Sequence, residues 1–195
     1  MKKKHLILFL ISLGFATDSF AKKEDWYWGL SVGTGTPTFT GAHASTISTL
    51  SADPAFSSST SASEFFLYFP SYGEGVLGVA AGGISKAFKH TTDASQNQFF
   101  GQSLLTASWL HSSGKEPGNG LLLRADVGYG SVFQTSGTSL LPTAGGTNAG
   151  LAVRAGLGYG FTLGENTRIM FLATVATVSS SGNPNYYALS VGPLF

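Results

Sequence analysis

Two segments in the C-terminal half of the chain alternate apolar and polar residues over an unusual length. In residues 121–133 and 151–163 the odd positions are mostly large and apolar, and the even positions include Arg124, Asp126, Arg154 and five glycines. A period of two indicates a β-strand with one apolar face. Thirteen residues exceed the five or six typical of a globular strand, and they suit a tilted strand that crosses a bilayer. The pattern therefore predicts strands of a transmembrane β-barrel.

The same alternation, with turn-rich interruptions, divides the chain into eight predicted strands. These are residues 26–33, 63–70, 75–88, 98–111, 120–134, 149–163, 167–179 and 186–195. Alternate connections are short (71–74, 112–119 and 164–166), and the others are mostly longer (36–62, 89–97, 135–148 and 180–185). Short turns on one side and longer loops on the other are typical of outer-membrane barrels. The predicted fold class is all-β, an eight-stranded antiparallel transmembrane up-and-down β-barrel.

The face of one predicted strand is ambiguous. In residues 75–88, Leu77 and Val79 favour the odd face, but Ile84 and Phe88 fall on the even face with Lys86. A β-bulge or a misplaced strand would account for the conflict.

The N-terminus has the pattern of a secretory signal peptide. Three lysines at positions 2–4 precede a mainly apolar stretch of ten residues at 6–15, and Ser19-Phe20-Ala21 forms a small-x-small cleavage site. A transmembrane anchor would need about 18 apolar residues or more. We therefore expect residues 1–21 to be removed and residues 22–195 to form the exported barrel.

Composition excludes several classes of function. Charged residues make up only 11% of the chain, and the formal net charge of +1 leaves no basic surface for nucleic acid. The absence of cysteine excludes disulfides and thiolate metal sites, and the four histidines show no metal-ligand spacing. We expect no cofactor, no metal and no nucleic-acid partner.

Aromatic residues fall near the two ends of the predicted strands. Tyr129, Phe133 and Tyr187 lie toward the outer boundary, and Trp26, Trp28, Trp109, Tyr159, Phe161 and Phe195 lie toward the periplasmic one. Amphipathic rings favour both membrane interfaces, so we predict an aromatic girdle. The alternative, a soluble barrel of lipocalin type, would have an apolar interior and a polar exterior.

The chain resembles the small eight-stranded outer-membrane β-barrels of Gram-negative bacteria. The resemblance rests on the signal peptide, the alternation and the final segment 186–195, which ends in Phe195 like the signal that such barrels present to their assembly machinery. Pro193 departs from the usual pattern, so it should lie near the periplasmic end or at an unpaired position. The resemblance implies outer-membrane lipids, lipopolysaccharide and the assembly machinery as partners. The group includes anchors, adhesins, invasion factors, channels and lipid A-modifying enzymes, so membership leaves function open.

Five charged residues are predicted to face the lumen: Glu64, Arg124, Asp126, Arg154 and Arg168. An outward arginine at mid-membrane would cost about 2–4 kcal/mol, and buried opposite charges should cluster. We expect Asp126 to be the counter-charge of Arg124 and Arg154. The cluster predicts a plug, because side chains just fill an eight-stranded interior, and a gated ion path is the alternative.

One group of residues invites a catalytic interpretation. His111-Ser112-Ser113, with Glu116 and Asp126, resembles the His, Ser and Glu of lipid A deacylases built on eight-stranded barrels. That family has its His and Ser near the C-terminus with Asn after the Ser, whereas Gly114-Lys115 follows here. We therefore predict no catalytic residues.

The first outer loop, predicted as 36–62, has the most distinctive composition. It holds 13 Ser or Thr among 27 residues and one charge, Asp53, a composition that resists compact folding. It could bind an external ligand or merely shield the rim. Four apolar residues, Phe39, Ile47, Leu50 and Phe56, could anchor it on the rim or fold it as strand extensions. His43 there and His90 in the next loop are expected to be solvated. The leading prediction is a non-enzymatic barrel with a structural or surface-contact role, and the alternatives are a lipid A-modifying hydrolase and a narrow solute channel.

Overall fold

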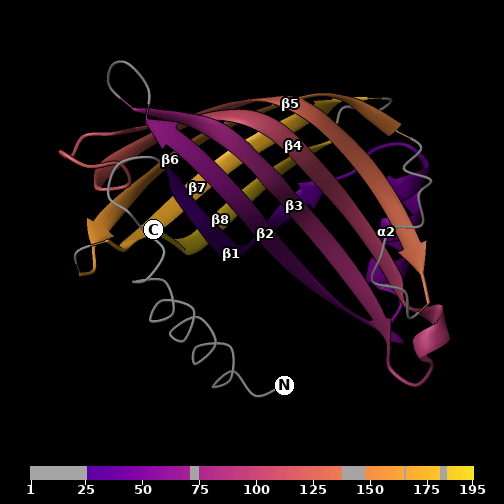
Figure 1. The fold of residues 1–195 in the computed structure, drawn as a ribbon. Helices are drawn as coiled ribbons and strands as arrows, with labels where there is room; N and C mark the ends of the chain where they lie inside the picture. The colour runs from indigo at the N-terminus through magenta and orange to yellow at the C-terminus, as the bar shows by residue number, and fades with distance from the viewer. Residues whose placement is uncertain (1–25, 71–74, 138–147, 165, 181–183) are drawn as a thin grey trace.

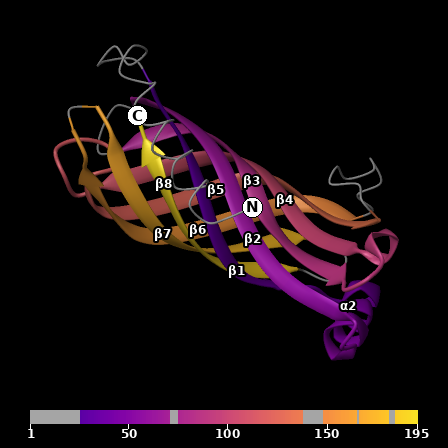
Figure 2. The same ribbon diagram turned by 90° about the horizontal axis from the view of Figure 1, so that it is seen from below.

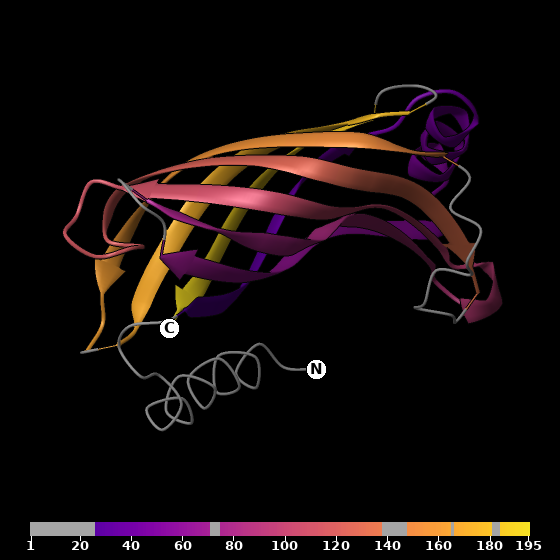
Figure 3. The same cartoon turned by 45° about the horizontal axis from the view of Figure 1, so that its top comes forward.

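The computed structural model describes residues 26–70, 75–137, 148–164, 166–180 and 184–195, so the predicted signal peptide 1–21 lies outside the described residues. The described chain forms a barrel of strands with one α-helix and one 3-10 helix at the end opposite the C-terminus (Figures 1 and 3). In chain order the elements are β1 (Tyr27–Thr38), α2 (Ala42–Ala52), β2 (Phe56–Pro70), β3 (Val76–His90), η1 (Ala94–Gln96), β4 (Gln98–Ser112), β5 (Gly120–Ser136), β6 (Asn148–Thr162), β7 (Arg168–Ser179) and β8 (Asn185–Leu194).

The sheet is closed. Each strand pairs antiparallel with its sequence neighbours, and β1 pairs with β8, which confirms the predicted up-and-down barrel of eight strands. The closing seam ends in a reciprocal pair, because the Trp28 amide donates to the Phe195 carbonyl at 3.2 Å and the Phe195 amide to the Trp28 carbonyl at 2.9 Å. Beside it, the β1–β8 pairing passes from Gly29–Leu194 to Val32–Val191, so it is interrupted at Pro193. Pro193 therefore lies near the C-terminal end of β8, which is the predicted periplasmic end of the barrel, and beside a gap in the ladder, as expected.

Six strands begin and end within two residues of their predicted bounds. The connection between the first two strands is shorter than predicted. The predicted loop 36–62 is wrong in extent, because β1 continues to Thr38 and β2 begins at Phe56. Residues 56–62 pair with β3 from Phe56–His90 to Ala62–Ile84. Serine and threonine are compatible with strands that stand in water, so polar composition did not mark the strand's end.

Between β1 and β2 the chain forms helix α2. Its hydroxyl groups bond to the helix itself: Ser45 and Thr46 donate to the Ala42 carbonyl, and Thr49 donates to the Ser45 carbonyl, at 2.9–3.1 Å. Such bonds satisfy the hydroxyls within the helix, but they do not favour a helix over a turn.

Strand β3 is regular throughout. Its pairing with β2 and β4 is continuous, and Val76, Ala80, Ile84 and Phe88 are all buried. The bulge considered for residues 75–88 is therefore wrong. The conflict in the sequence arose because the interior accepts large apolar residues as well as small and polar ones.

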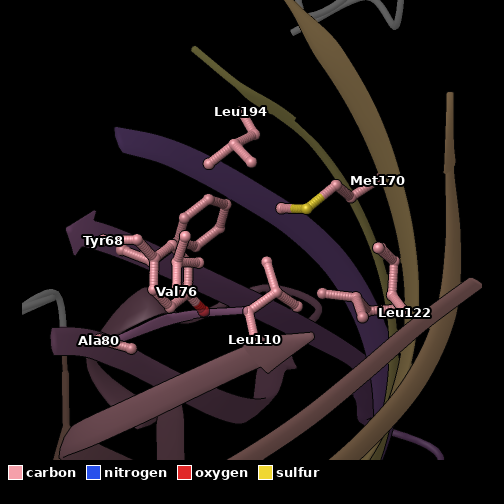
Figure 4. Packing of buried hydrophobic residues seen from close by; sticks show 9 residues of the cluster. Tyr68, Val76, Ala80, Leu110, Leu122, Met170 and Leu194 are labelled. Atoms are coloured by element: carbon pink, nitrogen blue, oxygen red, sulfur yellow. The ribbon is translucent and has the colours of Figure 1, made fainter. Parts of the chain in front are cut away.

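The interior contains two clusters of buried apolar side chains. One lies toward the end with the C-terminus, the predicted periplasmic end, and includes Tyr68, Leu110, Leu122, Met170 and Leu194, whose side chains converge from several strands (Figure 4). The other lies toward the end with α2, the predicted outer end, and contains Ala62, Ile84, Leu104, Ala152, Ala176, Val178, Tyr186 and Ala188. The outward positions are apolar too, with Leu105 62% and Leu189 65% exposed. An exterior of this kind is opposite to that of a soluble lipocalin-type barrel.

Candidate functional site

Four of the five predicted lumen charges form one buried cluster. The Arg124 guanidinium binds Glu64 through two nitrogens, at 2.6 and 2.8 Å, and its Nε donates to Asp126 at 3.0 Å. Arg154 forms ion pairs with both Asp126 and Glu64. Asp126 is thus the counter-charge of both arginines, as predicted, and Glu64 is a second one.

The charge cluster separates the two apolar clusters. Along β2 the inward positions run Ala62, Glu64 and Phe66, from the outer cluster through the charges to the periplasmic cluster. The side chains of Arg124 and Asp126 are fully buried. Two cations and two anions give the cluster no formal net charge, so each charge in it has a counter-charge.

Glycines make room for these long side chains. Gly82 is the pairing partner of Glu64, and Gly156 is the partner of Arg124. A Cβ on Gly156 would lie 3.3 Å from the Arg124 Cβ and 3.1 Å from the Thr174 Cγ2. The inward glycines of the sequence pattern therefore create the space that the arginines fill.

The space left within the charge layer is small. A cavity of about 20 Å³ lies between Glu64, Arg154 and Tyr186. A cavity needs roughly 10–15 Å³ to hold one water molecule. This gap can hold a single water.

Arg168 is buried, as predicted, but it belongs to a different pair. It binds the carboxylate of Glu116, in the β4–β5 turn, and donates to the Asn166 carbonyl at 3.3 Å. Its guanidinium lies 5.9 Å from the Tyr27 ring centroid. The prediction of one five-membered network is therefore corrected: Arg168 fixes the periplasmic end, because β7 begins at this residue and places it beside the turn.

The residues considered for catalysis do not converge. His111 points outward and stacks on Trp109 at 5.8 Å between ring centroids, whereas Asp126 is held in the lumen by two arginines. Ser112 accepts from the Gly118 amide at 3.2 Å, and Ser113 accepts from the Leu121 amide at 2.9 Å. These hydroxyls stabilise the β4–β5 turn. Among the described residues, no group of three or more His, Asp or Glu could hold a metal ion.

At the outer end the outward face changes from apolar to hydroxyl-bearing along one row of paired residues. Ser63, Gly83, Ser103 and Ser131 are successive partners across β2 to β5. Within this row the Ser103 and Ser131 hydroxyls bond each other at 2.7 Å. Two residues further from the C-terminal end of the barrel, the hydroxyls of the paired Ser61 and Ser85 bond each other at 3.0 Å. On β2, β4 and β5, the residues two positions closer to the predicted periplasmic end are Phe65, Leu105 and Tyr129, and their side chains are exposed. We refer to the row of Ser63, Gly83, Ser103 and Ser131 as the hydroxyl row.

Strands β2 to β5 continue past the hydroxyl row. Strand β2 extends seven residues beyond Ser63, to Phe56, which is about 24 Å of strand at ~3.4 Å per residue. Residues 57–59 and Ser61 in this extension are exposed. The extended part of β2 to β5 and helix α2 together form what we call the outer end, visible on the right of Figure 1.

Aromatic rings close the mouth at the outer end. Phe100, fully buried, contacts Phe39, His43 and Phe88 at 5.9–6.0 Å between ring centroids. The His43 Nδ1 lies 3.2 Å from the Gln134 Oε1, so the start of α2 is fastened across the lumen to β5.

Both histidines of the outer end have partners. His90 Nδ1 accepts from the Asp93 amide at 3.1 Å, and the His90 ring contacts Phe56 at 5.0 Å. The expectation that His43 and His90 are simply solvated is therefore wrong. Anchoring of this connection on the rim was one of the alternatives for Phe39, and its contact with Phe100 agrees with that alternative, whereas the contacts of His43 were not predicted.

The predicted girdle residues differ in exposure. Tyr129, Tyr159, Phe161 and Tyr187 are 41–61% exposed on the outer face. Trp26 is 46% exposed, whereas Trp28 is partly covered by Phe195, with ring centroids 4.8 Å apart.

In the described part of the chain, no helix is long and apolar enough to cross a membrane.

Comparisons with known proteins identify the architecture. No protein-family model matches the chain, and no curated protein is detectably similar to it in sequence. The crystal structure of neisserial surface protein A (NspA) matches with a TM-score of 0.51 at 7% identity, over 87% of this chain and 95% of that one.

Two further solved structures match less closely in shape. Ail, the attachment invasion locus protein of Yersinia pestis, has a TM-score of 0.47 at 11% identity, over 88% of this chain and 99% of that one. The outer-membrane protein AlkL, solved by solid-state NMR in lipid bilayers, has a TM-score of 0.39 at 13% identity, over 88% and 89%. On the closed topology and the match to NspA, the chain has the fold of the small eight-stranded outer-membrane β-barrels.

Proposed function

We propose that the protein is an integral outer-membrane barrel that neither conducts solutes nor catalyses a reaction, and that acts by contact through its outer end. The observation that carries this proposal is the continuation of β2 to β5 beyond the hydroxyl row, as a sheet whose exposed side chains are mainly hydroxyls. A rigid barrel that presents a structured surface at one end is suited to contact.

The exterior supports insertion in a bilayer. On β6 the outward residues are large and apolar from Leu151 to Phe161, apart from Ala155. These ten steps cover about 34 Å of strand at ~3.4 Å each, or roughly 25 Å of bilayer at a tilt of 35–45°. That value is close to the apolar band of outer-membrane barrels. The signal peptide 1–21 would supply export to this membrane.

The interior supports a closed lumen. The charge cluster of Glu64, Arg124, Asp126 and Arg154 fills the middle, with apolar clusters on both sides of it. Phe39 and His43 then cover the outer mouth. We therefore expect no stepwise conductance from the intact protein in planar bilayers, which is the measurement that separates this proposal from a solute channel.

The fold comparison agrees with a role at the cell surface. NspA, which has the same fold, is named a surface protein. We propose adhesion or ligand binding through the outer end, with outer-membrane lipids, lipopolysaccharide and the barrel-assembly machinery as the remaining partners.

The test displays the intact protein on a non-adherent Gram-negative strain and measures binding of the cells to epithelial monolayers. The triple variant Ser57→Ala, Ser59→Ala, Ser61→Ala should lower adhesion, because it removes three hydroxyls from the exposed sheet. Thr162→Ala changes an exposed hydroxyl at the opposite end and should leave adhesion unchanged.

Heat-modifiable migration on gels verifies that each variant is folded. Equal adhesion of the triple variant and the intact protein would contradict the contact role. A changed lipid A mass spectrum on expression would instead favour the hydrolase.

A further inference from the structure

The membrane-facing surface contains a groove that the proposed function does not use. A hollow of about 740 Å³ lies on the outer face of four neighbouring strands, β6, β7, β8 and β1. Three of these strands, β1, β8 and β7, lie side by side in Figure 2. The volume falls in the range of ligand pockets, about 300–1,000 Å³. None of its lining residues is charged.

Side-chain size explains the groove. Ala173 on β7 is flanked by its two pairing partners, Leu189 on β8 and Leu157 on β6. Two residues closer to the outer end, Ala155 on β6 pairs with Val175 on β7. The two alanines, on neighbouring strands, form a low floor between the taller side chains of Leu189, Leu157 and Val175.

The groove runs obliquely through the apolar belt. Thr34 and Leu189 are partners across β1 and β8, and the same row continues to Ala173 and Leu157. On β1 the outward apolar residues end at Val32, so Thr34 lies at the outer boundary of the belt. Leu157, in contrast, is near the middle of the apolar face of β6. The row therefore leads from the outer boundary toward mid-depth.

The groove covers the outer part of one leaflet. Three gaps between neighbouring strands span about 14 Å at ~4.8 Å each, which is roughly 8–10 Å of depth for strands tilted by 35–45°. Half of the hydrocarbon core is roughly 15 Å thick. A lipid chain of the outer leaflet starts at the same boundary, so the groove can hold the upper part of one chain.

The chemistry of the groove changes along its length. At the outer boundary it carries the hydroxyls of Thr34, Thr36 and Tyr187, all exposed, and toward mid-depth it is lined by alanine, valine and leucine. Hydroxyls at the interface can donate to ester oxygens, and the apolar part can only pack against hydrocarbon. The Thr34 Oγ1 lies 2.9 Å from the Thr60 Oγ1, and when Thr60 donates in this pair the Thr34 hydroxyl can still donate to an ester.

We propose that this groove binds one acyl chain of an outer-leaflet lipid, with the ester of that chain at Thr34 and Thr36. This inference rests on the proposed insertion in the outer membrane. The bound chain fills the low floor between Leu189 and Leu157, so the lipid is retained when the surrounding lipids exchange.

The test is native mass spectrometry of the full chain released from nanodiscs of palmitoyl-oleoyl phosphatidylethanolamine. The intact protein should retain one lipid at collision energies that remove the others. The double variant Ala155→Leu, Ala173→Leu fills the floor and should lose this lipid. Ala81→Leu, Ala107→Leu makes the same change at exposed alanines on β3 and β4, outside the groove, and should retain it.

A second variant keeps the proposal falsifiable if the filled groove impairs folding. Thr34→Val, Thr36→Val keeps the volume and removes two hydroxyls, and retention should fall. Retention of a lysolipid, with one chain, equal to that of the two-chain lipid would agree with a single bound chain. Release of a free fatty acid alone would overturn the assignment to a membrane lipid.

Three other results would also overturn the proposal: no retained lipid on the intact protein, equal retention by the filled variant, or a dimer that the filled variant abolishes. Insertion is checked first by heat-modifiable migration of the nanodisc sample. A chain that fails to insert contradicts the proposed function, whereas an inserted chain that retains no lipid contradicts this inference alone.

Discussion

The charge cluster in the lumen predicts a large and specific loss of stability when Asp126 becomes Asn. The Asp126 carboxylate is fully buried and pairs with both Arg124 and Arg154. Replacing it by an amide leaves two guanidinium groups with one carboxylate, that of Glu64. Removing one partner of a buried pair costs about 3–5 kcal/mol.

The expected value lies at the lower end of that range. Glu64 still contacts both arginines, and a cavity of about 20 Å³ admits no more than one water to solvate the excess charge. We therefore expect a loss of about 3 kcal/mol. For a urea m-value near 2 kcal/mol/M this lowers the unfolding midpoint by about 1.5 M.

The assay is urea unfolding of the barrel reconstituted in lipid vesicles, followed by tryptophan fluorescence. Adding Arg154→Gln should recover most of the midpoint, because one cation then faces one anion. Adding Arg124→Gln should recover less, because Arg124 holds Glu64 through two nitrogens. Asp53→Asn is the matched control, since Asp53 is exposed and only accepts from the Ala55 amide at 2.8 Å.

Two results would refute this reasoning. An Asp126→Asn midpoint equal to that of Asp53→Asn would mean that lumen water solvates the arginines. Failure of Arg154→Gln to restore any stability would mean that the loss comes from packing rather than from charge.

Three further predictions concern the ends and the wall of the barrel. Deleting Phe195 should lower the amount of folded barrel in the outer membrane, measured by heat-modifiable migration, because both backbone groups of Phe195 close the seam with Trp28; equal folding would show that the seam is dispensable. Hydrogen bonds from Ser95 and Gln96 hold the pKa of Asp93 below its ordinary value of 3.8. The stability that Asp93 gives to η1 should therefore be complete above pH 3.8 and lost as the pH falls through the lower pKa of the folded state. An NMR titration midpoint of Asp93 at or above 3.8 would contradict this. Gly156→Leu, which meets Arg124 and Thr174 inside the barrel, should cost about 1–3 kcal/mol in the urea assay, whereas the neighbouring outward Ala155→Leu should cost little; similar losses would show that the inward face has spare room.

Much of the barrel could be predicted from sequence because bilayer and lumen impose opposite chemistry on alternate residues. Arg124, Asp126 and Arg154 could be placed inside, since their neighbours Leu123, Ala125 and Val153 formed a consistent apolar face. The sequence showed less clearly which of these charges pair with one another. Glu64 is distant in sequence from both arginines, and only closure of the barrel brings β2 opposite β5 and β6.

The first half of β2, helix α2 and the groove were not predicted, because each depends on neighbouring parts of the structure and not on the composition of its own segment. The serine-rich first half of β2 was predicted to be a loop. Polar side chains on both faces of a strand show no alternation of apolar and polar residues, so the sequence pattern did not mark it as a strand. Helix α2 has no buried residue and little amphipathic pattern, so nothing local marked it. The groove depends on Ala173 and Ala155 lying between larger side chains of neighbouring strands, which is a property of register rather than of either strand alone.

The pairing of Trp28 with Phe195 also has a kinetic consequence. Seven of the eight strand pairs join sequence neighbours, whereas this seam joins residues 167 positions apart. Closing a loop of that length costs about 4–5 kcal/mol of chain entropy, so hairpins can accumulate before the seam forms. Until then β1 and β8 are two free, mutually complementary edges. The lifetime of this open sheet, rather than the stability of the finished barrel, then sets the chance that the edges of two chains pair with each other.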